Sequence, residues 1–241
     1  MPKKKSEPTE QVALDELRGS SQTLATPFNP LAIPNVALTL AVELLEQPIT
    51  SLPPLKSFSG AGVYAIYYIG KFDIYARLSE LNSENSCRVP IYVGKAVRKG
   101  ARVGIEFKAT TQAALFNRLK LHAKSIEGAG LELRDFRCKF LVVEDAFVAL
   151  AESVLIGVFR PLWNQVVTGF GNNPTGGPRS TQAQSMWDTL HPGRRRGSGQ
   201  AKAKTEAIRI VVENHLRANP LDSMDSELQR IAERLEKYTS R

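Results

Sequence analysis

Three short segments rich in β-branched and aromatic residues constrain the fold of this chain most. They cover residues 62–68, 90–94 and 136–143. Such residues favour the extended backbone of a strand, and the third segment becomes wholly apolar, as expected for a central strand. Because helical patterns lie between and after these segments, the sequence predicts an α/β fold with a small central mixed β-sheet flanked by helices.

Helical periodicity is clearest at residues 37–45, 111–126 and 147–159. The first of these ends before Pro53 and Pro54, which stop helical continuation because proline lacks the amide donor. Two further amphipathic helices, at 203–216 and 226–238, follow a flexible glycine- and serine-containing linker. We expect them to form a C-terminal helical hairpin that docks either on its own core or on another subunit.

The chain divides into three expected parts: an N-terminal tail and helical arm (1–50), a central domain (51–196), and a linker with the C-terminal hairpin (197–241). The whole chain carries a net charge of +8. Residues 51–196 hold the excess, with 20 basic and 11 acidic side chains. This concentration favours a polyanionic partner such as nucleic acid, and a surplus of solvated surface charge is the alternative.

Composition excludes several classes of protein. Cys87 and Cys138 are too few for a disulfide framework and lack zinc-finger spacing to other cysteines or histidines. No apolar run reaches the roughly 18 residues that a membrane span needs. The N-terminus leads into no signal-peptide core, so we expect a cytoplasmic protein without membrane contact.

Five side chains stand out as candidates for chemistry. Tyr64 and Tyr92 lie on the first two predicted strands, where tyrosine is also an ordinary packing residue. Arg118 and His122 are four residues apart and therefore project from one face of their helix. Glu152 is the only charged residue of the apolar helix 147–159. A carboxylate within a buried helix is unfavourable unless it is paired or bound to a metal.

The order of these residues resembles that of the GIY-YIG nuclease superfamily, whose catalytic domain is named for two tyrosine motifs. Gly62-Val63-Tyr64 and Tyr92-Val93-Gly94 are similar to those motifs. The family order is continued by the helix arginine, the metal-binding glutamate and a late asparagine, here Arg118, Glu152 and Asn164. The resemblance covers residues 51–196. It is closest to the type II restriction endonuclease branch, through residues 61–65, 90–96, 161–164 and 169–172.

A second candidate for the later motif is Tyr68-Ile69-Gly70, which spells it literally. It lies only four residues after Tyr64, too close for a returning strand to place it opposite the first tyrosine. We therefore predict that Tyr92 is the site residue and that Tyr67 and Tyr68 pack within the strand.

Hydrolysis of a phosphodiester needs a cation, a fixed hydrogen-bond donor and a proton acceptor. Glu152 is expected to hold one Mg²⁺, because this ion accepts one carboxylate together with water and substrate phosphate. Arg118 offers a bidentate fork for phosphate. As a general base, Tyr64 requires nearby positive charge, which Arg118, His122 and Lys95 supply.

The remaining roles are more open. Tyr92 is expected to position water or phosphate. His122 either receives a proton through Tyr64 or donates a hydrogen bond to the phosphate. Taken alone, Lys95 is a solvated turn residue and Asn164 a helix-capping side chain.

The resemblance also implies the partners: double-stranded DNA cut at a palindromic, GC-rich site, and a modification methyltransferase of the same system. A palindrome is matched by two-fold protein symmetry, so a homodimer is the minimum and a homotetramer the alternative. The rival functions are a structure-specific repair or homing nuclease and a non-catalytic DNA-binding module. The basic residues expected to contact DNA are Arg98, Lys99, Arg102, Lys108, Arg194, Arg195 and Arg196.

Overall fold

In the computed structural model, the described residues are 29–82, 86–98, 112–171, 183–193, 199–201 and 203–218. They include a four-stranded sheet with the strand order β1-β4-β2-β3. The strands are β1 (Thr50–Ser51), β2 (Gly62–Tyr68), β3 (Tyr92–Ala96) and β4 (Phe136–Val142). The α/β class and the small helix-flanked sheet are thus confirmed.

The pairings within this sheet are antiparallel throughout, which corrects the expectation of a mixed sheet. β3 and β4 both run opposite to β2, and β2 lies between them, so these two like-directed strands never pair. The parallel pairing in the described part of the chain joins two short strands elsewhere, β5 (Ala183–Gln184) and β6 (Gly199–Ala201).

The central strand β2 is buried along its whole length. Because side chains alternate across a strand, its residues divide between two apolar clusters. Tyr64, Ile66 and Tyr68 join the larger cluster on one face of the sheet. Val63, Ala65 and Tyr67 join the smaller cluster on the other face.

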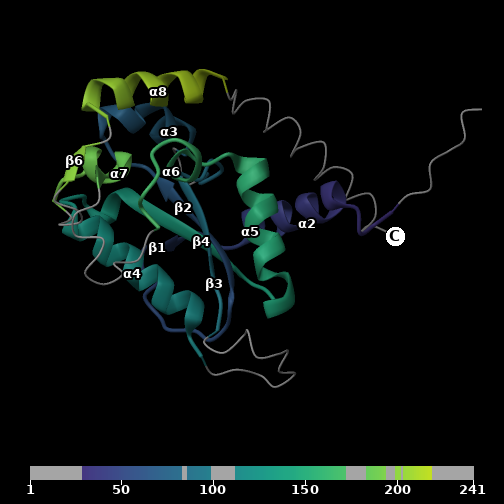
Figure 1. The fold of residues 1–241 in the computed structure, drawn as a ribbon. Coiled ribbons are helices and arrows are strands. Elements are labelled where there is room, and N and C mark those ends of the chain that lie inside the picture. The colour runs from purple at the N-terminus through teal and green to yellow at the C-terminus, as the bar shows by residue number, and fades with distance from the viewer. Residues whose placement is uncertain are drawn as a thin grey trace, which may run out of the picture.

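Helices cover both faces (Figure 1). The larger cluster includes side chains of α4 (Ala114–Gly128), α6 (Leu162–Gln165) and α7 (Met186–Leu190). The smaller cluster includes side chains of α2 (Ile33–Glu46) and α5 (Asp145–Phe159). The expected N-terminal helix therefore packs on the core. In the described ranges, no helix is both long and apolar enough to cross a membrane.

The first helix of the expected C-terminal hairpin, α8 (Thr205–Ala218), docks on its own core. Ile208 and Val212 are buried in the larger apolar cluster. Arg209 forms an ion pair of 2.8 Å with Asp73 in the short helix η1 (Asp73–Tyr75), which continues into α3 (Ala76–Leu81). Helix α8 also packs against α7. The second hairpin helix, at 226–238, lies outside the described residues.

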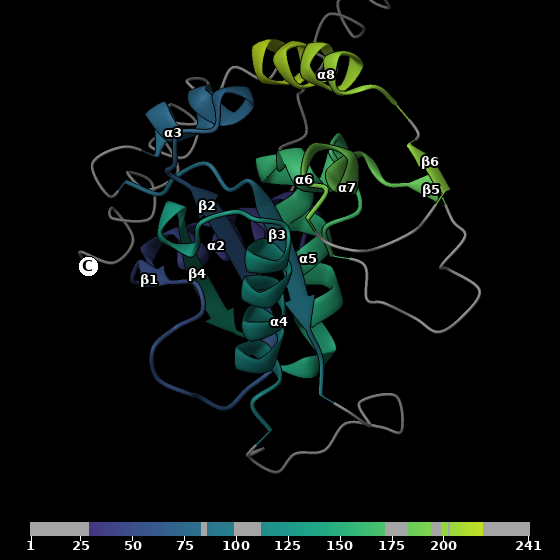
Figure 2. The ribbon, with the colours of Figure 1, turned by 90° about the vertical axis from the view of Figure 1, so that its left-hand side faces the viewer.

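The outer strand β3 has a special place in this architecture. It is an edge strand of the sheet, and α4 and α5 contact it from opposite faces. Figure 2 shows β3 running between these two helices. Side chains from both faces of the sheet therefore meet around a single strand edge.

Candidate active site

Tyr64 reaches the site from the middle of the sheet. Its side chain is fully buried, and its register partner on β3 is Gly94. A Cβ on residue 94 would overlap the Tyr64 hydroxyl, so only glycine lets this ring cross β3. The hydroxyl oxygen lies 2.5 Å from Nε2 of His122, a buried residue of α4.

Tyr92, the first residue of β3, lies on the same face of the sheet as Tyr64. Its ring centroid is 6.2 Å from that of Tyr64 and 5.4 Å from that of His122. Tyr64 and His122 are in turn 5.4 Å apart. The three rings form one compact group, and Tyr92 is the member that lines the open cleft beside it.

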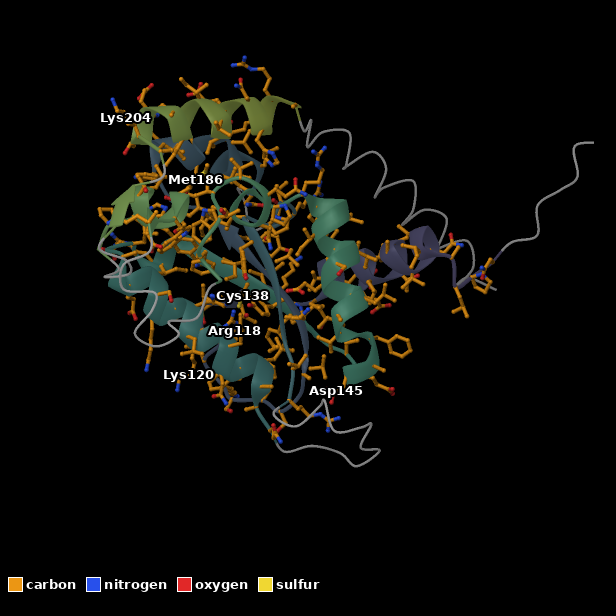
Figure 3. The ribbon with its side chains drawn as sticks, viewed as in Figure 1. Arg118, Lys120, Cys138, Asp145, Met186 and Lys204 are labelled. Atoms are coloured by element: carbon orange, nitrogen blue, oxygen red, sulfur yellow. The ribbon has the colours of Figure 1, made fainter. Side chains whose placement is uncertain are left out.

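Arg118 lies one turn before His122 on α4, as its spacing predicts. Its Nη2 donates a hydrogen bond of 2.7 Å to the carbonyl oxygen of Gly171. Figure 3 shows Arg118 on the inner side of α4, whereas Lys120 lies further out on the same helix. The guanidinium is therefore held at the cleft by the segment that follows α6.

Lys95 and Glu152 come from the opposite face of the sheet. Lys95 is on β3 and Glu152 on α5, and Lys95 Nζ lies 2.6 Å from Glu152 Oε2. The Glu152 side chain is 21% exposed and that of Lys95 38%. The carboxylate is thus paired and lies at the rim of the cleft, outside the apolar core. It therefore avoids the free-energy cost of burying an unpaired charge.

One cleft of about 730 Å³ is lined by four of these side chains: Tyr92, Lys95, Arg118 and Glu152. It is bounded by β3, by the start of α4 and by α5. Its walls are formed by Tyr92, Lys95, Ala96, Val97, Gln112, Ala113, Ala114, Asn117, Arg118, Leu121 and Glu152. A cleft that combines two cations, a carboxylate and a tyrosine suits a polyanionic substrate that must be held and hydrolysed.

Burial controls the proton affinity of both tyrosines. It raises the pKa of Tyr64 well above its usual value, and the positive charge of Arg118 offsets only part of this effect. The pKa of Tyr92 is raised for the same reason, with Arg118 lowering it and Glu152 raising it. The cations expected to favour a Tyr64 phenolate therefore do not outweigh burial, and both hydroxyls stay protonated at neutral pH.

Asn164 takes a different place from the other predicted site residues. Its Oδ1 accepts a hydrogen bond of 2.9 Å from the Val93 amide, and its Nδ2 donates one of 2.8 Å to the Val93 carbonyl. This pair of bonds satisfies the backbone of the outer strand between Tyr92 and Gly94. Asn164 thus acts on β3, where it replaces the missing neighbour strand.

Tyr68 has the packing role expected for it. Its hydroxyl accepts a hydrogen bond of 2.8 Å from the Phe72 amide, and its ring packs against Tyr75 and Phe136. It is nearly fully buried. The literal copy of the second motif therefore lies away from the cleft.

Among the predicted DNA contacts, Arg98 is the one whose side chain is described. It forms an ion pair with Asp145 at the start of α5, the residue labelled in Figure 3. The rest of this set lies outside the described residues and stays a prediction: Lys99, Arg102, Lys108, Arg194, Arg195 and Arg196.

Residues that the role assignment did not include also shape the site. Gly94 gives Tyr64 its path, Gly171 accepts the Arg118 hydrogen bond, and Phe170 stacks on His122 with ring centroids 4.6 Å apart. The first belongs to the second tyrosine motif, and the other two lie in the segment 169–172 that supports the resemblance. The sequence marked these positions but could not show what they contact.

A small antiparallel sheet with paired tyrosines, backed by a helical arginine and a glutamate, has the parts that a GIY-YIG nuclease requires. Comparison with family models agrees, because residues 56–216 match the Eco29kI GIY-YIG domain. The chain belongs to this family of restriction endonucleases. It is therefore a nuclease whose substrate is DNA. A search of curated proteins gave no significant match.

Proposed function

We propose that this protein is a Mg²⁺-dependent type II restriction endonuclease that makes sequence-specific double-strand breaks at a palindromic, GC-rich site. The observation that carries the proposal is the cleft around β3, where Tyr92, Arg118 and Glu152 line one space. Family membership supplies the nuclease class, and the cleft supplies residues suited to in-line hydrolysis of a phosphodiester.

Glu152 is the residue that would hold the metal ion. Its carboxylate faces the cleft and already binds the ammonium of Lys95, so a cation is accommodated there. Over the described ranges, three or more histidine, cysteine or carboxylate side chains do not gather into a metal cage. One carboxylate suits Mg²⁺, which keeps most of its waters and takes phosphate oxygens as further ligands. When bound, the ion would stabilise the charge that develops on the phosphate.

Arg118 and Tyr92 would hold the substrate. The Arg118 guanidinium lines the cleft and is fixed by the Gly171 carbonyl, so it can meet a phosphate without first being ordered. Tyr92 lies beside it with a protonated hydroxyl, which can donate a hydrogen bond to a phosphate oxygen or orient the attacking water.

Tyr64 and His122 would move the proton of the attacking water. Because the pKa of Tyr64 is raised, the tyrosine acts as a relay and not as a stored phenolate. Its hydroxyl passes a proton to Nε2 of His122, 2.5 Å away, as it accepts one from water. This geometry favours the relay over direct contact between His122 and the phosphate, because Nε2 is already engaged with Tyr64.

The remaining parts of the proposal concern recognition and assembly. A homodimer would place one cleft on each strand of a palindrome. The basic residues within 98–108 and at 194–196 would contact phosphates or base edges. Arg98 would make its contact either after release from Asp145 or while still paired with it. A cognate methyltransferase would protect the host site, and both enzymes would act in the cytoplasm.

The direct test is digestion of a plasmid library with the purified protein and Mg²⁺, followed by sequencing of the ends. The proposal predicts double-strand ends that share one palindromic sequence and disappear with EDTA. Ends at branched or damaged DNA without a shared sequence would favour a repair nuclease. Intact plasmid under all metal conditions, together with specific binding, would favour a non-catalytic module.

A further inference from the structure

Phe170 and Gly171 together contact three members of the proposed catalytic group: His122, Tyr92 and Arg118. They follow α6 in the chain. Phe170 is almost fully buried, with 1% of its surface exposed. It belongs to the larger apolar cluster, but its ring also reaches the site.

The ring of Phe170 makes two kinds of contact. Towards the core it packs against Trp163 at 4.6 Å and Trp187 at 5.2 Å between centroids. Towards the site it stacks on His122 at an interplanar angle of 24° and meets Tyr92 edge-on at 5.0 Å. A stacked neighbour restricts the plane of the imidazole, and that plane decides whether Nε2 points at Tyr64.

Gly171 fixes the other half of the group through its backbone. Its carbonyl accepts the hydrogen bond from Arg118. Its Cα lies so close to Tyr92 that a Cβ would overlap the tyrosine hydroxyl and lie 3.1 Å from Cζ. The absence of a side chain at residue 171 is thus a condition for the observed position of Tyr92.

The geometry points to Phe170-Gly171 as a positioning clamp for the catalytic group. Phe170 holds the imidazole of His122 in the plane that meets Tyr64, while Gly171 holds Arg118 through its carbonyl and leaves the space that the Tyr92 hydroxyl occupies. The two residues touch no reacting atom themselves. This inference deepens the proposed nuclease function and rests on it for its effect on rate, while the clamp itself is a property of the free protein.

The first test compares Phe170→Leu with Phe136→Leu. Both phenylalanines are buried and both pack against Trp163, but only Phe170 contacts His122. Phe170→Leu should lower the single-turnover cleavage rate at saturating DNA about 10- to 100-fold, since small misplacements of catalytic groups have effects of this size. DNA affinity measured in Ca²⁺ should stay within about threefold of wild type, because the phosphate contacts remain. Phe136→Leu should leave both quantities unchanged in its folded fraction.

The second measurement needs no nuclease activity. The chain has three histidines, so the imidazole ¹⁵N signals of His122 can be assigned by substitution. Wild-type protein should show one tautomer with Nε2 engaged, whereas Phe170→Leu should show averaged or broadened signals. Unchanged His122 signals in Phe170→Leu, or an equal loss of cleavage in Phe136→Leu, would overturn the clamp. If wild type cleaves no DNA, the nuclease proposal fails while the NMR result still judges the clamp.

Gly171→Ala tests the other half of the clamp. It should lower Tm, and Tyr92→Phe in that background should restore part of the loss, because removal of the hydroxyl relieves the overlap. Tyr92→Phe alone should not raise Tm. Absence of any recovery in the double variant would show that the position of Tyr92 does not depend on the space left at residue 171.

Discussion

At the residue scale, Glu152 is the one carboxylate among the described residues that lines the cleft. Glu152→Gln keeps the size of the side chain but removes the charge that would hold Mg²⁺. Cleavage should therefore fall by at least about 10³-fold, the scale of a lost electrostatic contribution to catalysis, while specific DNA binding persists. Rapid-quench assays and binding titrations in Ca²⁺ measure the two effects. Glu144→Gln, an exposed change just before α5, serves as the matched control.

Lys95 binds the carboxylate that would hold the proposed metal ion. Because its ammonium lies 2.6 Å from Oε2, it would repel an incoming cation and compete with it for the carboxylate. Lys95→Met should therefore bind metal several-fold more tightly, although cleavage falls if the lysine also contacts phosphate. Titration with Mn²⁺, followed by electron paramagnetic resonance, measures the affinity. Weaker binding in Lys95→Met would contradict this competition, and Lys95→Met/Glu152→Gln should abolish the binding in either case.

The two tyrosines that compete for the second motif should respond differently to loss of the hydroxyl. Tyr92→Phe should remove most cleavage activity, because its hydroxyl lies in the group around Arg118. Tyr68→Phe should leave the rate near wild type and reduce stability by about 1 kcal/mol, the value of its bond to Phe72. Single-turnover rates and chemical denaturation separate the two. The opposite pattern of rates would move the site to Tyr68.

The site residues that could be predicted from the sequence are those that are unusual in their surroundings and therefore point to chemistry. A lone carboxylate in an apolar helix and an arginine one turn before a histidine are patterns that chemistry restricts. The structure places Glu152 and Arg118 in the walls of one cleft and buries His122 beside it, against Tyr64. Asn164 and Arg98 were harder to interpret because their contacts are long-range: one binds the Val93 backbone and the other Asp145. Neither partner is near in sequence.

At the element scale, the outer strand β3 explains why the site exists. Tyr92 and Lys95 point to opposite faces of this strand, and the helices α4 and α5 reach its edge from those faces. The strands and long helices were predictable from side-chain periodicity. The pairing of β1 with β4 was not, because two residues leave no alternation to detect.

Helix α8 provides a test of the domain boundary expected at residue 196. Its residues Ile208 and Val212 are buried in the core that supports the site, and the family match extends to residue 216. Deletion of 203–241 should therefore destabilise the protein by about 1.5–3 kcal/mol for each buried side chain. Deletion of 219–241 alone should spare this core. Guanidinium denaturation of the two truncations decides the matter, and equal stability would place the boundary before α8.

At the scale of the whole molecule, the sheet separates two apolar layers, and buried ionisable groups lie in both. Cys138 and Tyr64 belong to the layer beneath α4, and Cys87 and Tyr67 to the layer beneath α2 and α5. Burial raises the pKa of each of these groups. Neither cysteine forms a disulfide. Burial therefore favours the protonated form of these four side chains.

This common direction predicts a loss of stability at alkaline pH. Burial raises the pKa of Cys138 to about 12, whereas a thiol in the unfolded chain titrates near 8.5. Below pH 8.5 the thiol is protonated in both the folded and the unfolded state, and its contribution to the free energy of unfolding is complete. Above it the unfolded state alone loses its proton, so the free energy of unfolding falls until the folded thiol ionises.

The slope from one such thiol approaches about 1.4 kcal/mol per pH unit in that window. The buried tyrosines add to it at higher pH, and Lys139, whose pKa is lowered by burial, opposes it. Urea denaturation at pH 7.5, 8.5, 9.5 and 10 should therefore show a growing loss. Cys138→Ser should have a shallower slope, because serine does not ionise in this range and its hydroxyl can keep the bond to the Ser51 carbonyl. An equal slope in that variant would assign the alkaline sensitivity to Cys87 or the buried tyrosines instead.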